Sequence, residues 1–156
     1  IVMIPFCRTL EEADKVLDVL AKNGLKRDKR QKDTLKIYVM GEIPSNVFLA
    51  DEFAKRFDGI SIGSNDLTQL VLGVDRDSDE LSHLFDARNQ AVRMAIKELI
   101  RKAHGHSCKV GICGQAPSDH PDFAEFLVRA GIDSISLNPD SIIEVKKRIA
   151  KLESKK

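Results

Sequence analysis

Two acidic residues follow two separate apolar runs of the sequence. Glu42 comes directly after "KIYVMG", and Asp66 follows "GISIG" with only Ser64 and Asn65 between them. Two carboxylates that approach each other raise the pKa of at least one of them unless a cation holds both. Hard oxygen ligands that are few in number, and so leave room for water and a substrate, suit Mg²⁺ or Mn²⁺. We predict that Glu42 and Asp66 bind such an ion together.

Each acid also has an ordinary structural interpretation. Glu42 could be a charge beside the helix that begins near Pro44, and Asp66 could be the N-cap of a following segment. For one isolated acid this second interpretation is the better one. Two acids at the ends of successive strands favour the interpretation that both bind one metal ion.

A third candidate is Cys113, in "GICGQAPSDHP". A cysteine within a strand usually acts as a small apolar side chain. This one stands at the end of an apolar run and is followed by glycine and polar residues, which favours a reactive role. An ordinary thiol has a pKa of about 8.5, so a suitable site lets it donate or accept a proton at neutral pH. Cys7 and Cys108 are predicted to be packing residues.

These residues must be positioned by the elements around them, and the sequence alternates between strands and helices. Thr9 is predicted to cap the first helix, because Glu12 follows three residues later. A basic loop is predicted at 25–36 and a short turn at 66–73, and Ser118 is predicted as an N-cap. The predicted strands are 1–6, 36–43, 59–63, 109–114 and 132–138, and the predicted helices are 9–24, 44–57, 89–105, 118–131 and 139–156.

Near-continuous apolar strands separated by helices indicate a parallel sheet covered by helices, in an α/β fold. Two architectures fit this pattern, an open doubly wound sheet and part of a (β/α)8 barrel. Both place functional residues at the carboxyl ends of the strands. The polar residues at those ends should therefore converge on one rim; they are Arg8, Glu42, Asn65, Asp66, Cys113, Gly114 and Asn138.

The composition excludes several classes of protein. Hydrophobic residues make up 42% and charged residues 31% of the 156 residues, which is typical of a folded globular chain. Lys and Arg number 25 against 24 Asp and Glu, so no charge excess predicts a nucleic acid or a membrane surface as a partner. Three cysteines without a CxxC spacing favour a reducing compartment, the cytoplasm. The start, "IVMIPF", resembles no signal peptide, and we expect the chain to be a piece of a longer one.

Two long stretches resemble a known family. "GEIPSNVFLADEFAKRFDGISIGSNDLTQLVLGVDRDS" and "VGICGQAPSDHPDFAEFLVRAGIDSISLNPDS" are similar to the phosphoenolpyruvate/pyruvate barrel of the enzymes that use phosphoenolpyruvate. The resemblance covers nearly the whole chain, including "MIPF" at the start. "NDLTQ" alone also fits pyruvate phosphate dikinase and enzyme I of the sugar phosphotransferase system. "CGQ" and "SDHPDFAEFLV" resemble the phosphoenolpyruvate synthase branch (pyruvate, water dikinases).

The resemblance implies a partial (β/α)8 TIM barrel of five parallel β/α units, barrel strands four to eight, with residues 1–156 as a C-terminal fragment of the phosphoenolpyruvate/pyruvate-binding domain. It implies that Glu42 and Asp66 hold Mg²⁺, that both contact substrate together with Gly63, Ser64 and Asn65, and that Cys113 exchanges a proton with the substrate carbon. The implied reaction converts ATP, pyruvate and water to AMP, phosphoenolpyruvate and phosphate through enolate formation and a phosphohistidine on another domain.

The chain also departs from the family. None of its four histidines lies in a phosphocarrier motif, and the first three barrel strands, with the arginines that the family uses there, are absent. We therefore expect the isolated chain to be inactive and, with two exposed sheet edges, to form homo-oligomers. Two alternatives stay open, a catalytically silent folding or dimerisation module and another Mg²⁺-dependent enolate lyase or aldolase on the same barrel. The segment around Cys113, "GICGQAPSDHP", argues against the second alternative.

Overall fold

The computed structural model describes residues 1–25, 27 and 34–154. The middle of the basic loop predicted at 25–36, and the last two residues of the helix predicted at 139–156, lie outside the described residues. No helix in the described ranges is both long and apolar enough to cross a membrane.

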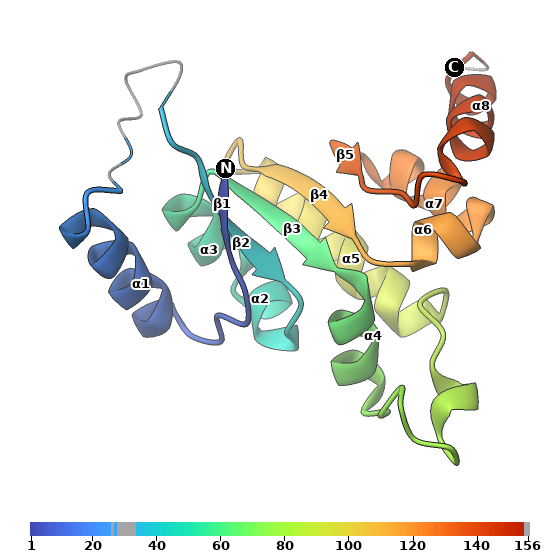
Figure 1. Cartoon of the computed structure of the whole chain (residues 1–156), viewed down its shortest axis with the longest axis horizontal. Coiled ribbons are helices and arrows are strands. Elements are labelled where there is room, and N and C mark those ends of the chain that lie inside the picture. The colour runs from blue at the N-terminus through green and yellow to red at the C-terminus, as the bar shows by residue number, and fades with distance from the viewer. Residues whose placement is uncertain (26, 28–33, 155–156) are drawn as a thin grey trace.

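The strands form one parallel sheet whose spatial order follows the chain order, β1-β2-β3-β4-β5 (Figure 1). A doubly wound sheet would reverse its strand order at a switch point, and this one runs in a single direction. The winding is therefore that of a (β/α)8 barrel, and the predicted partial barrel is confirmed. The strands are β1 (Val2–Ile4), β2 (Ile37–Gly41), β3 (Gly59–Gly63), β4 (Lys109–Cys113) and β5 (Ser134–Ile135).

The first and last strands are shorter than predicted. β1 ends at Ile4 rather than residue 6, because Phe6 has a φ of 52° and the chain leaves the extended conformation there. β5 covers only Ser134–Ile135 of the predicted 132–138. In the described sheet each of these strands pairs with one neighbour, β2 or β4, so neither is held on both sides.

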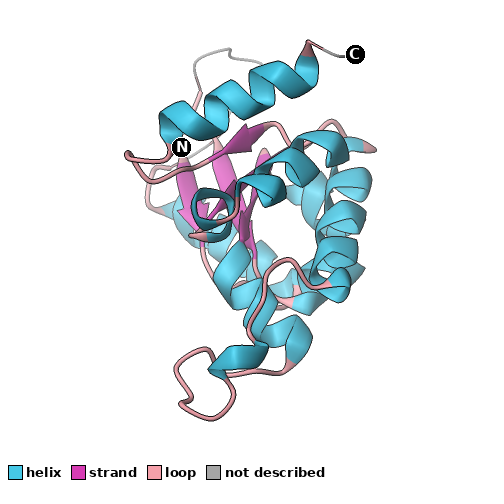
Figure 2. Cartoon of the chain, turned by 90° about the vertical axis from the view of Figure 1, so that its right-hand side faces the viewer, coloured by secondary structure: helices cyan, strands magenta, loops and turns pink. Residues whose placement is uncertain are grey.

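The helices are α1 (Leu10–Lys22), α2 (Pro44–Phe48), α3 (Ala50–Arg56), α4 (Ser64–Leu72), α5 (Gln90–His104), α6 (Ala116–Asp119), α7 (Pro121–Ala130) and α8 (Ile142–Glu153), with one 3₁₀ turn, η1 (Ser82–Leu84). The predicted cap of α1 is confirmed, since the Thr9 hydroxyl accepts a hydrogen bond from the Glu12 N–H at 3.2 Å. The segment between α4 and α5 extends away from the sheet, at the bottom of both views (Figures 1 and 2).

The turn predicted at 66–73 is wrong, because this segment is the helix α4. Its apolar residues Leu67, Leu70 and Val71 have helical spacing, and Leu67 is completely buried. The helix ends at Gly73, whose φ of 64° suits a left-handed C-cap. Ser64, Asn65 and Asp66 therefore form the first turn of a helix that begins directly after β3.

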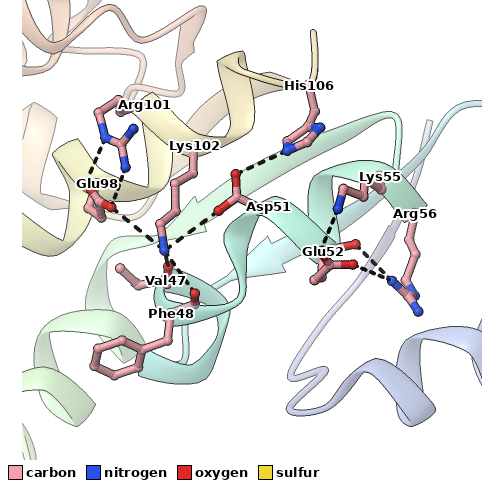
Figure 3. Close-up of polar contacts among 10 residues, drawn as sticks. All are labelled: Val47, Phe48, Asp51, Glu52, Lys55, Arg56, Glu98, Arg101, Lys102 and His106. Atoms are coloured by element: carbon pink, nitrogen blue, oxygen red, sulfur yellow. Dashed lines mark hydrogen bonds and ion pairs between the residues drawn. The ribbon is translucent and has the colours of Figure 1, made fainter.

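The single helix predicted at 44–57 is divided into α2 and α3 at Leu49. The break frees carbonyl groups at the end of α2, and a distant side chain satisfies them. Lys102, on α5, donates hydrogen bonds to the carbonyl oxygens of Phe48 at 2.9 Å and Val47 at 3.4 Å (Figure 3). A cation at the carboxyl end of a helix also interacts favourably with the helix dipole.

The helix predicted at 118–131 is divided as well, into α6 and α7. Pro121 disfavours a helical conformation at the preceding residue, and His120 is extended, with φ −128° and ψ 90°. His120 rather than Ser118 is thus the N-cap of α7, and the prediction for Ser118 is wrong. The Ser118 hydroxyl instead accepts a hydrogen bond from the Asn138 N–H at 2.9 Å.

The two faces of the sheet differ in side-chain size. The outer face packs against α5: a Cβ on Gly41 would lie 2.9 Å from Leu99 of that helix. This face is apolar and buried, and its residues include Ile37, Val39, Ile60, Ile62, Val110 and Ile112. The inner face carries small residues on β3 and β4, namely Gly59, Ser61, Gly63 and Gly111, and larger ones on β2, namely Tyr38 and Met40. The outer face therefore holds the core, and on the inner face the larger side chains of β2 lie over the glycines of β3.

An aspartate stands before β3 and another before β5, and both make the same contact. The Asp58 carboxylate accepts the N–H of Ile37 at 2.9 Å, and the Asp133 carboxylate accepts the N–H of Val110 at 2.8 Å. Each aspartate N–H also donates to the carbonyl of that same residue on the neighbouring strand, at 2.9 Å. These paired bonds fix the register of neighbouring strands at the end opposite the rim.

Candidate functional site

The predicted rim forms at the carboxyl ends of β2, β3 and β4. Gly41 pairs with Ile62, and Gly63 pairs with Cys113, so these three strands end side by side. Glu42 follows β2, α4 begins with Ser64, Asn65 and Asp66, and Cys113 is the last residue of β4. The structure thus brings together all six residues predicted at the site, Glu42, Gly63, Ser64, Asn65, Asp66 and Cys113.

Two other predicted rim residues have different surroundings. The Arg8 guanidinium lies 3.4 Å from the Glu12 carboxylate and over the Phe6 ring, 5.4 Å from its centroid. The Asn138 N–H donates to Ser118, as described above. The contacts of Arg8 and Asn138 therefore stabilise loops and do not join them to the acidic pair.

Glu42 is only 2% exposed, and hydrogen bonds hold the backbone around it. Its Oε1 accepts the N–H of Phe6 at 2.8 Å. Its own N–H donates to Asn46 Oδ1 at 3.2 Å, and the Asn46 amide donates to the Cys7 carbonyl at 2.8 Å. The carboxyl group is therefore placed by two loops that lie far apart in the sequence.

The charge of Glu42 is disfavoured where it lies. Burial raises the pKa of the Glu42 carboxyl, and the neighbouring carboxylate of Asp66 raises it further, although the Phe6 N–H acts in the opposite direction. Burial is the largest cause, and the smaller contribution of Asp66 has the direction expected for two carboxylates at one site without a cation. The two acids are close enough to interact electrostatically, as the strand order predicted.

The donor set fits a magnesium ion. No group of three or more His, Cys, Asp and Glu side chains within the described ranges could hold a metal, so the protein would supply the two carboxylates. Mg²⁺ commonly binds through one or two carboxylates and completes its shell with water and substrate oxygens. A cation between Glu42 and Asp66 would also remove the repulsion that raises the Glu42 pKa.

Ser64 presents a buried hydroxyl to the rim. Its Oγ is buried and makes no hydrogen bond in the part of the chain that the structure describes. It lies against Gly114, where a Cβ would collide with it, and Gly114 has a φ of 110° that side chains rarely adopt. Because buried polar groups are normally paired, an unpaired hydroxyl at this position indicates a place for a ligand atom.

Cys113 is half-buried, and its thiol contacts β3. Sγ lies 3.5 Å from the carbonyl oxygen of Ile62 and 3.7 Å from the hydroxyl of Ser61. Cys7 and Cys108 are 4% and 3% exposed, which confirms their prediction as packing residues. Cys113 is therefore the most accessible cysteine and the one that lies at the rim.

The sequence analysis missed Ser61 and Asn46. Ser61 is a polar residue in the middle of "GISIG", a strand that is buried along its whole length. Asn46 follows Glu42 by four residues, in "EIPSN". The available signal for Ser61 was a hydroxyl within an otherwise apolar strand, and the signal for Asn46 was an amide four residues after a candidate metal ligand.

A polar cavity of about 300 Å³ adjoins the rim at Asn65. Its lining includes His83, Arg88, Gln115 and His120. A larger apolar groove of about 710 Å³ lies elsewhere, between α2, α4 and α5, and is lined by residues such as Val47, Phe48, Leu70 and Met94. Of the predicted site residues, Asn65 lines the smaller cavity and none lines the larger groove, so size alone does not indicate the site.

Comparisons with known proteins identify relatives of the chain. The family model described as "PEP-utilising enzyme, PEP-binding domain" matches residues 1–154. Proteins named phosphoenolpyruvate synthase are 61% identical over 151 residues in Synechocystis sp., 57% over 154 residues in Aquifex aeolicus and 53% over 152 residues in Escherichia coli. These matches cover 97%, 99% and 97% of this chain, which spans only 18–19% of the relatives' length.

Solved structures share the fold at low sequence identity. An HpcH/Hpal aldolase/citrate lyase family protein from Burkholderia cenocepacia has a TM-score of 0.64 and 18% identity, with 99% of this chain and 64% of that chain covered. Citrate synthase SbnG has a TM-score of 0.60 and 15% identity, with coverage of 98% and 62%. These likenesses show the fold alone.

Proposed function

Because the chain belongs to the PEP-binding domain family of the PEP-utilising enzymes, we propose that its rim binds pyruvate and phosphoenolpyruvate as part of a phosphoenolpyruvate synthase. The observation that supports this most strongly is the position of Glu42 after β2, where burial and the neighbouring Asp66 raise the pKa of its carboxyl, two strands away from the thiol of Cys113 on β4. The reaction proposed for the full-length protein converts ATP, pyruvate and water to AMP, phosphoenolpyruvate and phosphate.

Glu42 and Asp66 would hold Mg²⁺ through their carboxylate oxygens. When bound, the ion would supply Lewis-acid stabilisation of negative charge on the substrate's oxygens. Glu42 already accepts the Phe6 N–H on Oε1, which fixes the orientation of its carboxyl group before any ligand arrives. This preorganisation reduces the reorganisation needed on binding.

The first turn of α4 would bind the substrate carboxylate and carbonyl. The N–H groups of this turn have no partners within the helix, and the positive end of the helix dipole favours an anion. The buried Ser64 hydroxyl can donate one further hydrogen bond, and Asn65 carries an amide beside it. Gly63, directly before this turn, lies against Glu42, and a side chain there would collide with that acid.

Cys113 would move the proton. As a thiolate it accepts a proton from the methyl carbon of pyruvate, while the electron pair of that C–H bond moves toward the carbonyl oxygen. As a thiol it returns a proton to the methylene carbon of phosphoenolpyruvate in the reverse direction. The phosphoryl group would come from a phosphohistidine on another domain of the full-length protein.

The proposed location is the cytoplasm, because three cysteines without a CxxC spacing suggest a reducing environment.

Calorimetric titration with oxalate, which resembles the enolate of pyruvate, tests the proposal. Binding by the full-length protein should require Mg²⁺ and should be lost in Asp66→Ala. The exposed acid Asp79 lies outside the rim, so Asp79→Ala should bind as the unaltered protein does. Equal oxalate binding with and without Mg²⁺, or full binding by Asp66→Ala, would overturn the proposed site. The same titration on this 156-residue chain would show whether these five strands are sufficient.

A further inference from the structure

Ser61 is a buried hydroxyl on the inner face of β3 and contacts the thiol of the next strand. It is 6% exposed, and its Oγ lies 3.7 Å from Cys113 Sγ. Hydroxyl groups buried in a parallel strand require a hydrogen-bond partner, and the sulfur is the partner described for this one. The contact joins residues 52 positions apart in the sequence.

The strand register places this contact. Ser61 pairs directly with Gly111, and Cys113 pairs directly with Gly63, so Ser61 and Cys113 are diagonal neighbours on one face of the sheet. The space above the two glycines is taken by other side chains: a Cβ on Gly63 would lie 2.5 Å from Glu42 Oε2, and a Cβ on Gly111 would lie 2.5 Å from Ser134 Oγ. Because neither Ser61 nor Cys113 faces a side chain on its own paired residue, the hydroxyl and the sulfur meet across the diagonal.

The two contacts of the sulfur favour opposite protonation states. The thiol S–H donates to the Ile62 carbonyl oxygen at 3.5 Å, and this hydrogen bond exists only while the sulfur carries its proton. The Ser61 O–H donates to the sulfur itself, and a hydrogen bond to an anionic acceptor is stronger than one to a neutral acceptor. The carbonyl therefore stabilises the thiol, and the hydroxyl stabilises the thiolate.

We propose that Ser61 is a positioning residue that holds the Cys113 sulfur toward the rim and stabilises it in the form that accepts a proton. The inference rests on the proposed function, in which Cys113 takes a proton from a 2-keto acid. The titratable groups on the surrounding elements are Glu42, Asp66, Lys109, Asp119 and His120, and none of them has a described hydrogen bond or ion pair with Sγ. Glu42 and Asp66 are carboxylates at the same rim and cannot donate a hydrogen bond to a thiolate when they are ionised. The neutral hydroxyl of Ser61 can donate one.

The test is the pH dependence of Cys113 alkylation by iodoacetamide in the full-length protein, followed by mass spectrometry of the peptide that contains Cys113. The alkylation midpoint should rise by about one pH unit in Ser61→Ala, because the thiolate loses a charge-assisted hydrogen bond. Ser61→Thr keeps the hydroxyl and should restore the midpoint. Ser134→Ala removes a hydroxyl from the same face of the neighbouring strand and should leave it unchanged.

The kinetic result is expected to follow the alkylation result. Ser61→Ala should lower kcat about tenfold with little change in KM, because the substrate contacts remain in place. An unchanged alkylation midpoint in folded Ser61→Ala would overturn the proposal, as would a shift of equal size in Ser134→Ala. If Ser61→Ala does not fold, Ser61→Gly removes the same donor without adding volume.

Alkylation needs no turnover, so the two proposals fail separately. Full activity of a Cys113→Ala variant would refute the acid–base role of the cysteine. A midpoint shift in Ser61→Ala would still establish the contact between Ser61 and the sulfur. An inactive Cys113→Ala variant together with an unchanged midpoint in Ser61→Ala would keep the proposed function and refute the role of Ser61.

Discussion

The carboxylate of Glu42 occupies the space beside Gly63: a Cβ added to Gly63 would lie 2.5 Å from Glu42 Oε2 and 2.8 Å from Glu42 Cβ. Atoms this close are excluded in real structures, so an alanine at this position must displace the carboxyl group. The backbone of Gly63, with φ −84° and ψ 90°, does not itself require glycine. The conflict is therefore with the acid and not with the local conformation.

Gly63→Ala should accordingly impair the metal site proposed at Glu42 and Asp66. We expect kcat/KM to fall by about 10²-fold, because displacing a reacting or ligating group by about 1 Å has effects of this size. Mg²⁺-dependent binding of oxalate, measured by calorimetry, should weaken in parallel. Gly105→Ala, at the end of α5, is the matched control, and its binding should stay unchanged. Normal oxalate affinity in Gly63→Ala would contradict the prediction.

Glu42→Gln should stabilise the protein while it removes metal binding. A folded-state pKa above the unfolded value means that folding favours the protonated carboxyl. As the pH rises above the pKa of this carboxyl in the unfolded chain, the free energy of unfolding therefore decreases. The decrease is complete once the pH exceeds the raised pKa of the folded protein. A glutamine is always uncharged and still accepts the Phe6 N–H.

Thermal unfolding without Mg²⁺ measures this effect. At pH 7 the stability gained by Glu42→Gln should be about 1 kcal/mol, and it should disappear below the ordinary glutamate pKa of 4.5. Glu98→Gln is the matched control, because hydrogen bonds from Arg101 lower the pKa of Glu98 and its neutralisation should destabilise the protein slightly. A lower Tm for Glu42→Gln than for the unaltered protein at pH 7 would disprove the argument.

Cys113→Ala should abolish the proton transfer proposed for the rim. Loss of a positioned acid or base typically slows a reaction by about 10²–10⁴-fold. The direct measurement is exchange of the methyl protons of pyruvate with deuterated solvent, followed by NMR in the presence of Mg²⁺. Cys108→Ala removes a buried thiol at the other end of β4 from the rim and should exchange at the normal rate if it folds. Normal exchange in Cys113→Ala would assign the proton transfer to another group.

Asp58→Ala should loosen the end of the sheet opposite the rim. The Asp58 side chain is 11% exposed, accepts the buried Ile37 N–H at 2.9 Å, and lies 3.4 Å from the Arg27 guanidinium. Leaving a buried N–H unpaired costs about 1–3 kcal/mol. Hydrogen exchange at the Ile37 amide should become correspondingly faster, while Asp140→Ala, an exposed control, should not change it. Equal protection of Ile37 in both variants would show that Asp58 is dispensable there.

The isolated chain should self-associate, because its edge strands are uncovered. β1 has one described neighbour, and Ile1, Met3 and Phe6 beside that edge are 78%, 41% and 42% exposed. Open strand edges with apolar side chains pair readily with other chains. Light scattering should give a mass above 17.4 kDa that rises with concentration. Met3→Lys should reduce it, and a constant mass of 17.4 kDa for the unaltered chain would refute the prediction.

Local sequence determined the alternation of strands and helices, the cap at Thr9 and the polar residues at the strand ends. Each depends on hydrophobic spacing or on side chains within a few residues, which is information that a short segment carries by itself. Glu42, Asp66 and Cys113 could thus be placed at one rim without coordinates, because parallel strands all end on the same side.

The tertiary structure decided which strands are neighbours and which distant groups meet. The uninterrupted strand order excluded the doubly wound sheet. The sequence could not make this distinction, because the spacing of apolar residues within a strand is the same in both architectures. The carbonyl groups at the end of α2 are satisfied by Lys102, 55 residues from Val47. The Ser61–Cys113 contact depends on the register of two strands and on the glycines that each residue faces. These features follow from the packing of segments far apart in the chain, which local propensity does not encode.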